Sequence, residues 1–299
     1  MNVGHGFNLN GEPHKLAHVG QAAWIFRTGA VPAGRDPVAI PLSRAARLQA
    51  GREKRNSNIP AFLQAVYGYD PNTAFVHPVS IYRSETDRPP ASVSVKQTAP
   101  FLADTGELTY DPAERIYKVH SDQAAGLFGF LGARPHTAGP LSVEVTPGSR
   151  GFAAVLLTPL DGQSLARSRR LLLTLPGYTL RSRPGADPPQ PQALVNYPGT
   201  SDWFTLEPEP GSTRPSGNLN GGAAPTWMER IEAAITLELP AIQLLVYPLD
   251  STGARLDPLP ASNIEKAGAG FRFRLQTPNQ PLTPWYELVL GPPPITRRR

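Results

Sequence analysis

Proline and glycine divide this chain into short segments. There are 35 prolines and 27 glycines among 299 residues, and only 18% of the residues are charged. Both residue types disrupt helices, so a bundle of long helices is incompatible with their distribution. Short apolar runs between turn residues are typical of strands. The sequence therefore predicts a mainly β protein with antiparallel β-sandwich layers and a short helical segment near the N-terminus.

The helical segment is predicted at 13–28. Leu16, Val19, Ala23 and Phe26 recur there at helical spacing, and a glycine follows the end. The next elements expected are a strand at 36–42, a basic helix at 43–51 capped by Ser43, a helix at 59–67, and a strand at 73–82 interrupted by Pro78. The apolar stripe of 13–28 needs a partner surface, and without one we expect self-association through this helix.

From residue 92 onward the pattern is almost wholly that of strands. The predicted strands are 93–95, 107–110, 115–119, 127–131, 141–145, 152–159, 169–175, 231–239, 241–248, 270–276 and 285–290. Residues 184–222 are dense in Pro, Gly, Ser and Asn, which indicates a long loop. The chain is thus divided into an α+β segment at 1–90, a β-sandwich at 91–291 and a basic tail at 292–299.

Composition limits the chemistry. The absence of cysteine excludes disulfides, thiolate nucleophiles and cysteine-based metal sites. No signal-peptide pattern and no apolar run of roughly 18 residues occurs, so no compartment is indicated and no membrane span is expected. The net charge of +5, with basic clusters at 44–55 and 297–299, suits an anionic partner. Aromatic residues are not interleaved with these clusters, so a solvated helix face and a tail explain them more simply than nucleic-acid binding does.

Several motifs carry a resemblance to a known group of proteins. Residues 104–111 read Asp-Thr-Gly-Glu-Leu-Thr-Tyr-Asp, and Gly-Leu-Phe-Gly-Phe-Leu follows at 126–131. Further similar segments occur in the expected order at 10–17, 22–29, 37–43, 164–174, 229–237, 246–255 and 285–288. With these motifs the chain resembles the C-terminal β-sandwich region of large bacterial glycoside-hydrolase-like proteins that have a clan-A-type barrel.

This resemblance implies that 1–90 is a remnant of the barrel edge and that the remainder is a supporting sandwich. Such enzymes carry two catalytic carboxylates at the ends of barrel strands. The resemblance places the start of this chain where the eighth strand would end. We therefore expect no catalytic residue, metal or cofactor in the chain, and a polysaccharide or a catalytic barrel as its partner.

Two groups of polar residues have alternative interpretations. Asp104, Glu107 and Asp111 surround a glycine turn and could form a glycosidase-like carboxylate cluster, but acids beside a turn usually bind backbone donors. His14 and His18 have the i, i+4 spacing that allows joint zinc binding. No HExxH pattern or third ligand accompanies them, so a packed or solvated pair is the simpler interpretation.

Aromatic residues in the long loop are the predicted carbohydrate contacts. Tyr197, Trp203 and Trp227 lie in or beside it, where their rings could form an exposed platform for sugars. Trp24 and Trp285 lie within patterned elements and are predicted to be core residues.

Three functions remain open from the sequence. The first is a non-catalytic accessory or structural β-domain of a glycoside-hydrolase-like protein, associated with carbohydrate. The second is a glycosidase subunit, or truncated hydrolase, whose barrel is supplied by another chain. The third is an anion- or nucleic-acid-binding protein.

Overall fold

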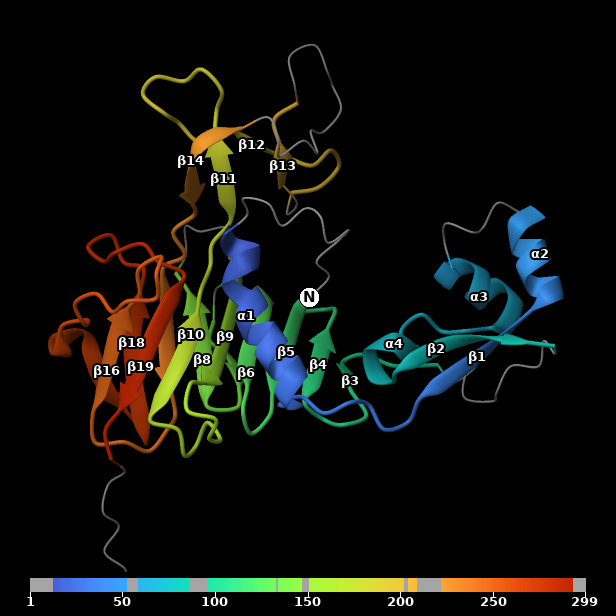
Figure 1. Cartoon of the computed structure of the whole chain (residues 1–299), viewed down its shortest axis with the longest axis horizontal. Coiled ribbons are helices and arrows are strands. Elements are labelled where there is room, and N and C mark those ends of the chain that lie inside the picture. The colour runs from blue at the N-terminus through green and yellow to red at the C-terminus, as the bar shows by residue number, and fades with distance from the viewer. Residues whose placement is uncertain are drawn as a thin grey trace, which may run out of the picture.

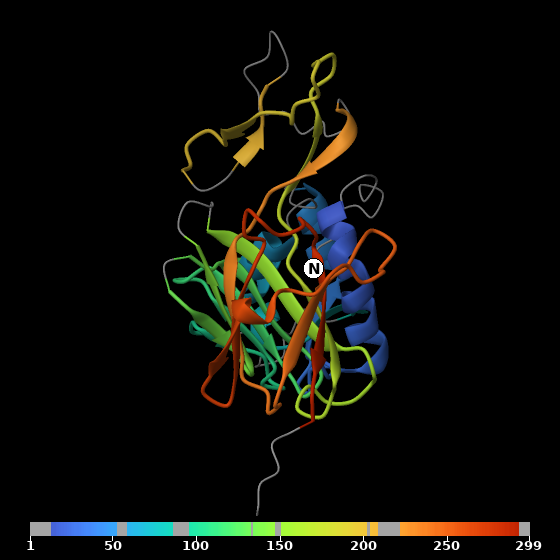
Figure 2. The same ribbon diagram turned by 90° about the vertical axis from the view of Figure 1, so that its left-hand side faces the viewer.

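The computed structural model describes residues 13–52, 59–85, 96–132, 134–146, 151–201, 204–208 and 222–292. Two antiparallel sheets form a sandwich, a small α/β unit lies at one side of it, and a narrow β extension projects from one end (Figures 1 and 2). The predicted mainly β fold with antiparallel sandwich layers and a short helical N-terminal segment is confirmed.

The larger sheet has eight strands. In spatial order they are β16 (Leu244–Pro248), β19 (Trp285–Leu290), β10 (Arg170–Thr174), β9 (Phe152–Pro159), β6 (Ala125–Phe130), β5 (Ile116–His120), β4 (Leu108–Asp111) and β3 (Phe101–Leu102). Every neighbouring pair is antiparallel. β3 was not predicted, because two residues are too few to show an alternating pattern.

The smaller sheet has five antiparallel strands. In spatial order they are β17 (Ile264–Ala267), β18 (Gly270–Leu275), β15 (Ala233–Leu237), β8 (Leu141–Val145) and β7 (His136–Ala138). Its inward side chains, such as Val143, Ile235 and Phe273, meet Leu127 and Leu157 of the larger sheet in one core. Burial of each such side chain contributes about 1.5–3 kcal/mol, so this core is the main source of stability.

The α/β unit consists of a two-stranded parallel sheet and three helices. Its elements are β1 (Val38–Ser43), α2 (Arg44–Arg52), α3 (Ile59–Tyr67), α4 (Thr73–Val76) and β2 (Val79–Ser84). The Ser43 hydroxyl accepts a hydrogen bond from the amide of Ala46 at 3.0 Å, which confirms the predicted helix cap.

One predicted element in this unit is wrong. The segment 73–82 was expected to be a strand throughout, but its first four residues form α4. The Asp70 side chain accepts a hydrogen bond from the Asn72 amide at 2.9 Å, and the Thr73 amide donates to the Asp70 carbonyl. This local turn chemistry overrides the β preference of the apolar residues that follow.

Helix α1 (Pro13–Thr28) has the predicted limits and lies on the outer face of the eight-stranded sheet (Figure 1). Its buried face, however, differs from the predicted stripe. Ala17, His18 and Gln21 are buried, whereas Ala23 is exposed and Phe26 is 87% exposed. The helix is rotated in this way because its polar side chains find hydrogen-bond partners on the sheet.

The projecting extension, here called the neck, spans the described parts of 179–228. It contains two antiparallel pairs: β11 (Thr179–Ser182) with β14 (Ala223–Met228), and β12 (Leu194–Asn196) with β13 (Phe204–Leu206). Figure 2 shows it rising from one end of the sandwich. The prediction of a structureless loop at 184–222 is therefore wrong in part, because β12 and β13 form a short hairpin inside it.

Candidate functional site

The most distinctive surface is a line of aromatic side chains across the outer face of the eight-stranded sheet. Phe101 pairs in register with Tyr110, Tyr110 with Tyr117, and Tyr117 with Phe128. Side chains directly opposite each other on one face of a sheet lie in contact. Strand alternation turns the intervening residues, such as Ile116 and Leu127, into the core.

Three further rings extend this line at its ends. Phe75 of α4 lies 5.2 Å from Phe101 and 4.8 Å from Tyr110, measured between ring centroids. At the other end Phe152 lies 5.1 Å from Phe128 and 5.5 Å from Phe130. We call these residues the aromatic row: Phe75, Phe101, Tyr110, Tyr117, Phe128, Phe130 and Phe152.

The rings of the row differ in what they present to solvent. Tyr110 and Tyr117 stack with centroids 4.0 Å apart and planes at 7°, so their faces cover each other and their edges point outward. Phe128 is inclined at 61° to Tyr117 and is 48% exposed. Burial and the neighbouring Tyr110 raise the pKa of Tyr117, so its hydroxyl stays protonated at neutral pH. The row therefore offers both apolar rings and hydroxyl groups.

Two helices flank the row on the same face. α1 covers β9 and β10 on one side, and α4 contributes Phe75 on the other (Figure 1). Leu108, 43% exposed, precedes Tyr110 by two residues and lies on the same face of β4. The result is an elongated, apolar and partly exposed surface rather than a closed pocket. Such a shape suits an extended ligand or a protein surface.

The predicted sugar contacts lie elsewhere, in the neck. Tyr197 follows β12 and is 50% exposed, and Trp227 of β14 is 37% exposed. The Trp227 indole donates to the Ser182 hydroxyl at 2.8 Å. Among the described residues no ring contact joins Tyr197 to Trp227. Trp203 lies outside the described residues.

Neither the aromatic row nor its register was recognised from the sequence, although the alternation of Tyr110, Tyr117 and Phe128 with apolar residues was a usable signal.

The other two tryptophans were predicted to be core residues, but neither is fully buried. Trp24 and Trp285 are both half-buried, and the Trp285 indole donates to the Ala17 carbonyl of α1 at 3.3 Å. Trp285 therefore helps to hold α1 on the sheet.

The three carboxylates proposed as a cluster are not one cluster. Asp104 and Glu107 precede β4, whereas Asp111 ends it, and a four-residue strand is about 13 Å long. Asp111 accepts hydrogen bonds from the amides of Ala113 and Glu114 at 2.9 and 3.2 Å. The turn interpretation is thus the right one for Asp111, whose carboxylate is engaged by the turn that follows β4.

Of the two histidines of α1, His18 has a described side chain. His18 is buried and its Nδ1 lies 2.8 Å from the Thr174 hydroxyl of β10. The Thr174 hydroxyl donates to Gln21 Oε1, so it accepts from His18 Nδ1–H. His18 therefore packs against the sheet. The side chain of His14 lies outside the described ones.

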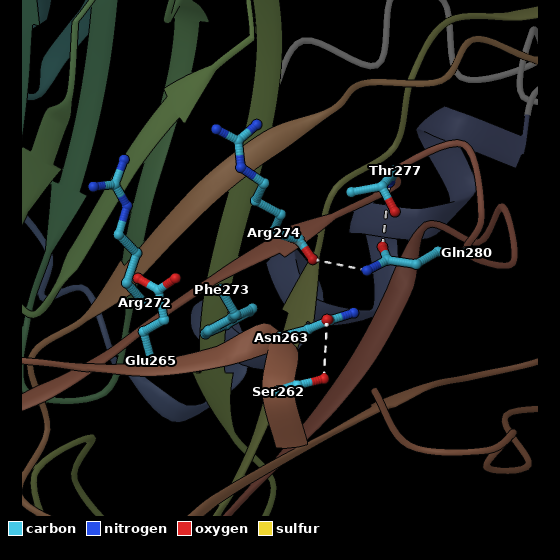
Figure 3. Close-up of a pocket in the computed structure, with 8 residues that line it drawn as sticks. All are labelled: Ser262, Asn263, Glu265, Arg272, Phe273, Arg274, Thr277 and Gln280. Atoms are coloured by element: carbon cyan, nitrogen blue, oxygen red, sulfur yellow. Dashed lines mark hydrogen bonds between the residues drawn. The ribbon is translucent and has the colours of Figure 1, made fainter. Parts of the chain in front are cut away.

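The pocket in Figure 3 is a shallow hollow of about 460 Å³ on the five-stranded sheet. Arg272 and Arg274 line it, but their guanidinium groups pair with Glu144 at 3.3 Å and Glu232 at 3.0 Å on neighbouring strands. Gln280 is bound to the carbonyl of Arg274. Because the cations are already paired, the pocket has little capacity to hold an anion.

Basic residues lie on both the α/β unit and the sandwich. Arg44, Arg47 and Arg52 lie on α2, while Arg170 and Arg255 pair with Glu287 on the sandwich. This dispersal does not favour the nucleic-acid hypothesis, for which a continuous basic face is required. The cluster at 297–299 lies outside the described residues.

Fold and surface together define an antiparallel β-sandwich with an exposed aromatic row. No protein-family model, curated protein or solved structure matches the chain. In the described part of the chain, no helix has the length and apolarity needed to cross a membrane.

Proposed function

We propose that this chain is a non-catalytic β-sandwich module that binds polysaccharide through the aromatic row. The resemblance to the C-terminal region of glycoside-hydrolase-like proteins belongs to this proposal, in which the module accompanies a hydrolase barrel. The observation that carries it is the registered row of partly exposed rings. Apolar ring surface together with tyrosine hydroxyls is the combination that contacts both the C–H faces and the hydroxyl groups of sugars.

The dimensions of the row support a polymer rather than a single sugar. Phe101 at the β3 end is only 5% exposed, so the exposed part of the row in the sheet crosses the strands from β4 to β9, which is three inter-strand spacings of about 4.8 Å, or about 14 Å. An open strip of this length can contact several consecutive sugar rings. Its lack of enclosing walls favours binding along a chain over capture of one chain end.

A second candidate is docking of a protein partner, for which a catalytic barrel is the expected example. The stacking of Tyr110 on Tyr117 supports it, because stacked rings leave few ring faces free for sugars. Exposed Leu108 and Phe75 also have the character of interface residues. A glycosidase subunit completed by another chain would use the row in this way.

The first test is affinity electrophoresis of the chain against a polysaccharide panel, with release of reducing ends measured on the same samples. We expect retardation without release. Tyr117→Ala and Phe128→Ala should each weaken retardation about tenfold, equal to about 1.4 kcal/mol. Tyr197→Ala and Trp227→Ala are the matched controls in the neck and should bind as the wild type does.

Each other outcome has a definite meaning. Loss of binding in the neck variants alone would move the site to Tyr197 and Trp227. Release of reducing ends would overturn the non-catalytic assignment. No retardation by any polysaccharide, with Tyr117-dependent capture of a hydrolase barrel, would favour the protein-docking function.

A further inference from the structure

Three segments far apart in the sequence converge beside the aromatic row. Asp36 precedes β1, His77 follows α4, and Asp104 lies in the turn between β3 and β4. One donor atom from each residue lies within 4.8 Å of the other two. His77 Nδ1 and Asp104 Oδ2 are 3.3 Å apart. An imidazole and two carboxylates are thus brought to one point by tertiary structure alone.

Backbone groups hold the Asp104 carboxylate in place. Its Oδ2 accepts hydrogen bonds from the amides of Asp36 at 2.9 Å and Arg35 at 3.1 Å, and its own amide donates to the Val76 carbonyl at 2.9 Å. The Asp36 amide is the main cause that lowers the pKa of Asp104. The side chain of Asp104 is only 4% exposed. Outer contacts of this kind orient metal ligands in proteins.

The other oxygen of Asp104 is left without a partner. Oδ1 is fully buried and accepts no hydrogen bond from the described residues. Gly34 packs over it, since a Cβ at Gly34 would lie 3.2 Å from Oδ1 and 2.4 Å from Pro78 Cγ. A buried carboxylate oxygen with no partner is costly, and a cation held by the same carboxylate would lower that cost by neutralising its charge. The hydrogen bonds from the amides of Asp36 and Arg35 satisfy Oδ2, but they leave Oδ1 without a partner.

We propose that Asp36, His77 and Asp104 form a binding site for a divalent cation of the zinc type. One imidazole nitrogen with two carboxylate oxygens is a donor set that zinc accepts, and three protein ligands leave a fourth position for water. The 3.3 Å between His77 Nδ1 and Asp104 Oδ2 is close to the edge, about 3.4 Å, of a tetrahedron with bonds of about 2.1 Å. Asp36 is exposed and provides the route of entry.

A cation at this point would join the α/β unit to the sandwich. Its ligands come from the segment before β1, from the end of α4 and from the β3–β4 turn. Phe75, which heads the aromatic row, lies two residues before His77. The cation would therefore also fix one end of the row. Because it concerns different residues, this site can exist whether or not the row binds polysaccharide.

The test uses the full chain without a histidine tag, stripped with chelator and titrated with Zn²⁺ by calorimetry and by thermal unfolding. We expect one Zn²⁺ per chain, a dissociation constant of about 1 µM or tighter, and a rise of several degrees in the unfolding temperature. Asp36→Asn and His77→Gln should each weaken binding at least about tenfold. His120→Gln, an exposed histidine on β5, is the matched control and should bind normally.

Two results would overturn the site. One is a wild-type chain that shows no saturable Zn²⁺ binding. The other is binding retained by both His77→Gln and Asp36→Asn, which in combination with loss in His14→Gln would place the metal on α1. Circular dichroism of each variant, recorded without metal, separates loss of ligand from loss of fold.

Discussion

At the scale of single residues, the most informative group is Glu287. This carboxylate of β19 is 6% exposed and accepts from Arg170 Nε at 2.7 Å and from Arg255 Nε and Nη2 at 2.7 and 2.8 Å. Hydrogen bonding to Arg255, followed by that to Arg170, lowers the pKa of Glu287 below its ordinary 4.5. Both arginines are about half-exposed, so solvent screening limits the strength of the network.

Replacing Glu287 by Gln should reduce stability in a pH-dependent way. The pKa is lowered in the folded state, so the ionised carboxylate stabilises the fold fully above about pH 4.5, and this contribution is lost as the pH falls through the folded pKa. In urea unfolding, the free energy of unfolding of Glu287→Gln should be about 1–2 kcal/mol lower than that of the wild type at pH 7. This difference should become smaller below pH 4.5.

The matched control for this prediction is Glu144→Gln. Glu144 pairs with Arg272 on the surface, where the Arg272 side chain is 48% exposed and the Glu144 side chain 35% exposed. Surface pairs are worth about 0–1 kcal/mol, so we expect a loss under about 0.5 kcal/mol. Equal losses in the two variants, or a Glu287→Gln loss that is independent of pH, would contradict the role assigned to Glu287.

At the scale of elements, α1 shows how a polar face can dock a helix. Gln21 Nε2 donates to the Thr158 hydroxyl at 2.9 Å and to the Leu172 carbonyl at 3.0 Å, and Gln21 Oε1 accepts from Thr174. Removing one partner from such a buried network leaves the others unsatisfied. The helix is therefore positioned by hydrogen bonds to two strands as much as by apolar contact.

Replacing Gln21 by Leu should remove the side-chain hydrogen bonds between this position of α1 and the strands β9 and β10. The Thr174 hydroxyl would lose its acceptor and the Leu172 carbonyl its side-chain donor, so we expect a loss of about 2 kcal/mol in urea unfolding. Phe26→Gln is the matched change on the opposite face of α1, where the side chain is 87% exposed, and should be nearly neutral. A larger loss in Phe26→Gln would restore the predicted Leu16, Val19, Ala23 and Phe26 stripe as the packing face. Self-association through this helix stays a prediction. Sedimentation of the Gln21→Leu and Phe26→Gln variants would test it.

At the scale of the whole molecule, the neck is an addition to a sandwich that is complete without it. Leu206 is the single buried apolar side chain among the described residues of 179–228. The core cluster instead unites the two sheets, from Ile116 to Leu290. The neck therefore contributes little to the free energy of folding.

Deleting the neck should leave a folded sandwich. Residues 183–222 can be replaced by Asn-Gly, because Ser182 and Ala223 are paired and a two-residue turn connects such strands. We expect a change of under about 1 kcal/mol in unfolding, against a loss of about 2–5 kcal/mol for the core variant Leu157→Ala. Polysaccharide retardation should persist in the deletion. Its loss, in a chain that still unfolds cooperatively, would show that the neck carries the site.

Local sequence determined the elements of this protein. Short apolar runs at 141–145, 152–159 and 285–290 predicted β8, β9 and β19 with their observed limits, helical spacing predicted α1, and the segment 59–67 was predicted as the helix α3. These patterns are readable because secondary structure reflects a period within one segment. The predicted division into parts at 1–90, 91–291 and 292–299 stays a prediction.

Tertiary structure alone decided which side chains meet. Strand register aligned Tyr110, Tyr117 and Phe128 into one row, since a shift of one residue would have turned them into the core. Hydrogen bonding to β9 and β10 selected the buried face of α1 over the more apolar one. The convergence of Asp36, His77 and Asp104 joins segments up to 68 residues apart. No local pattern encodes such contacts, because they depend on how separate segments pack against one another.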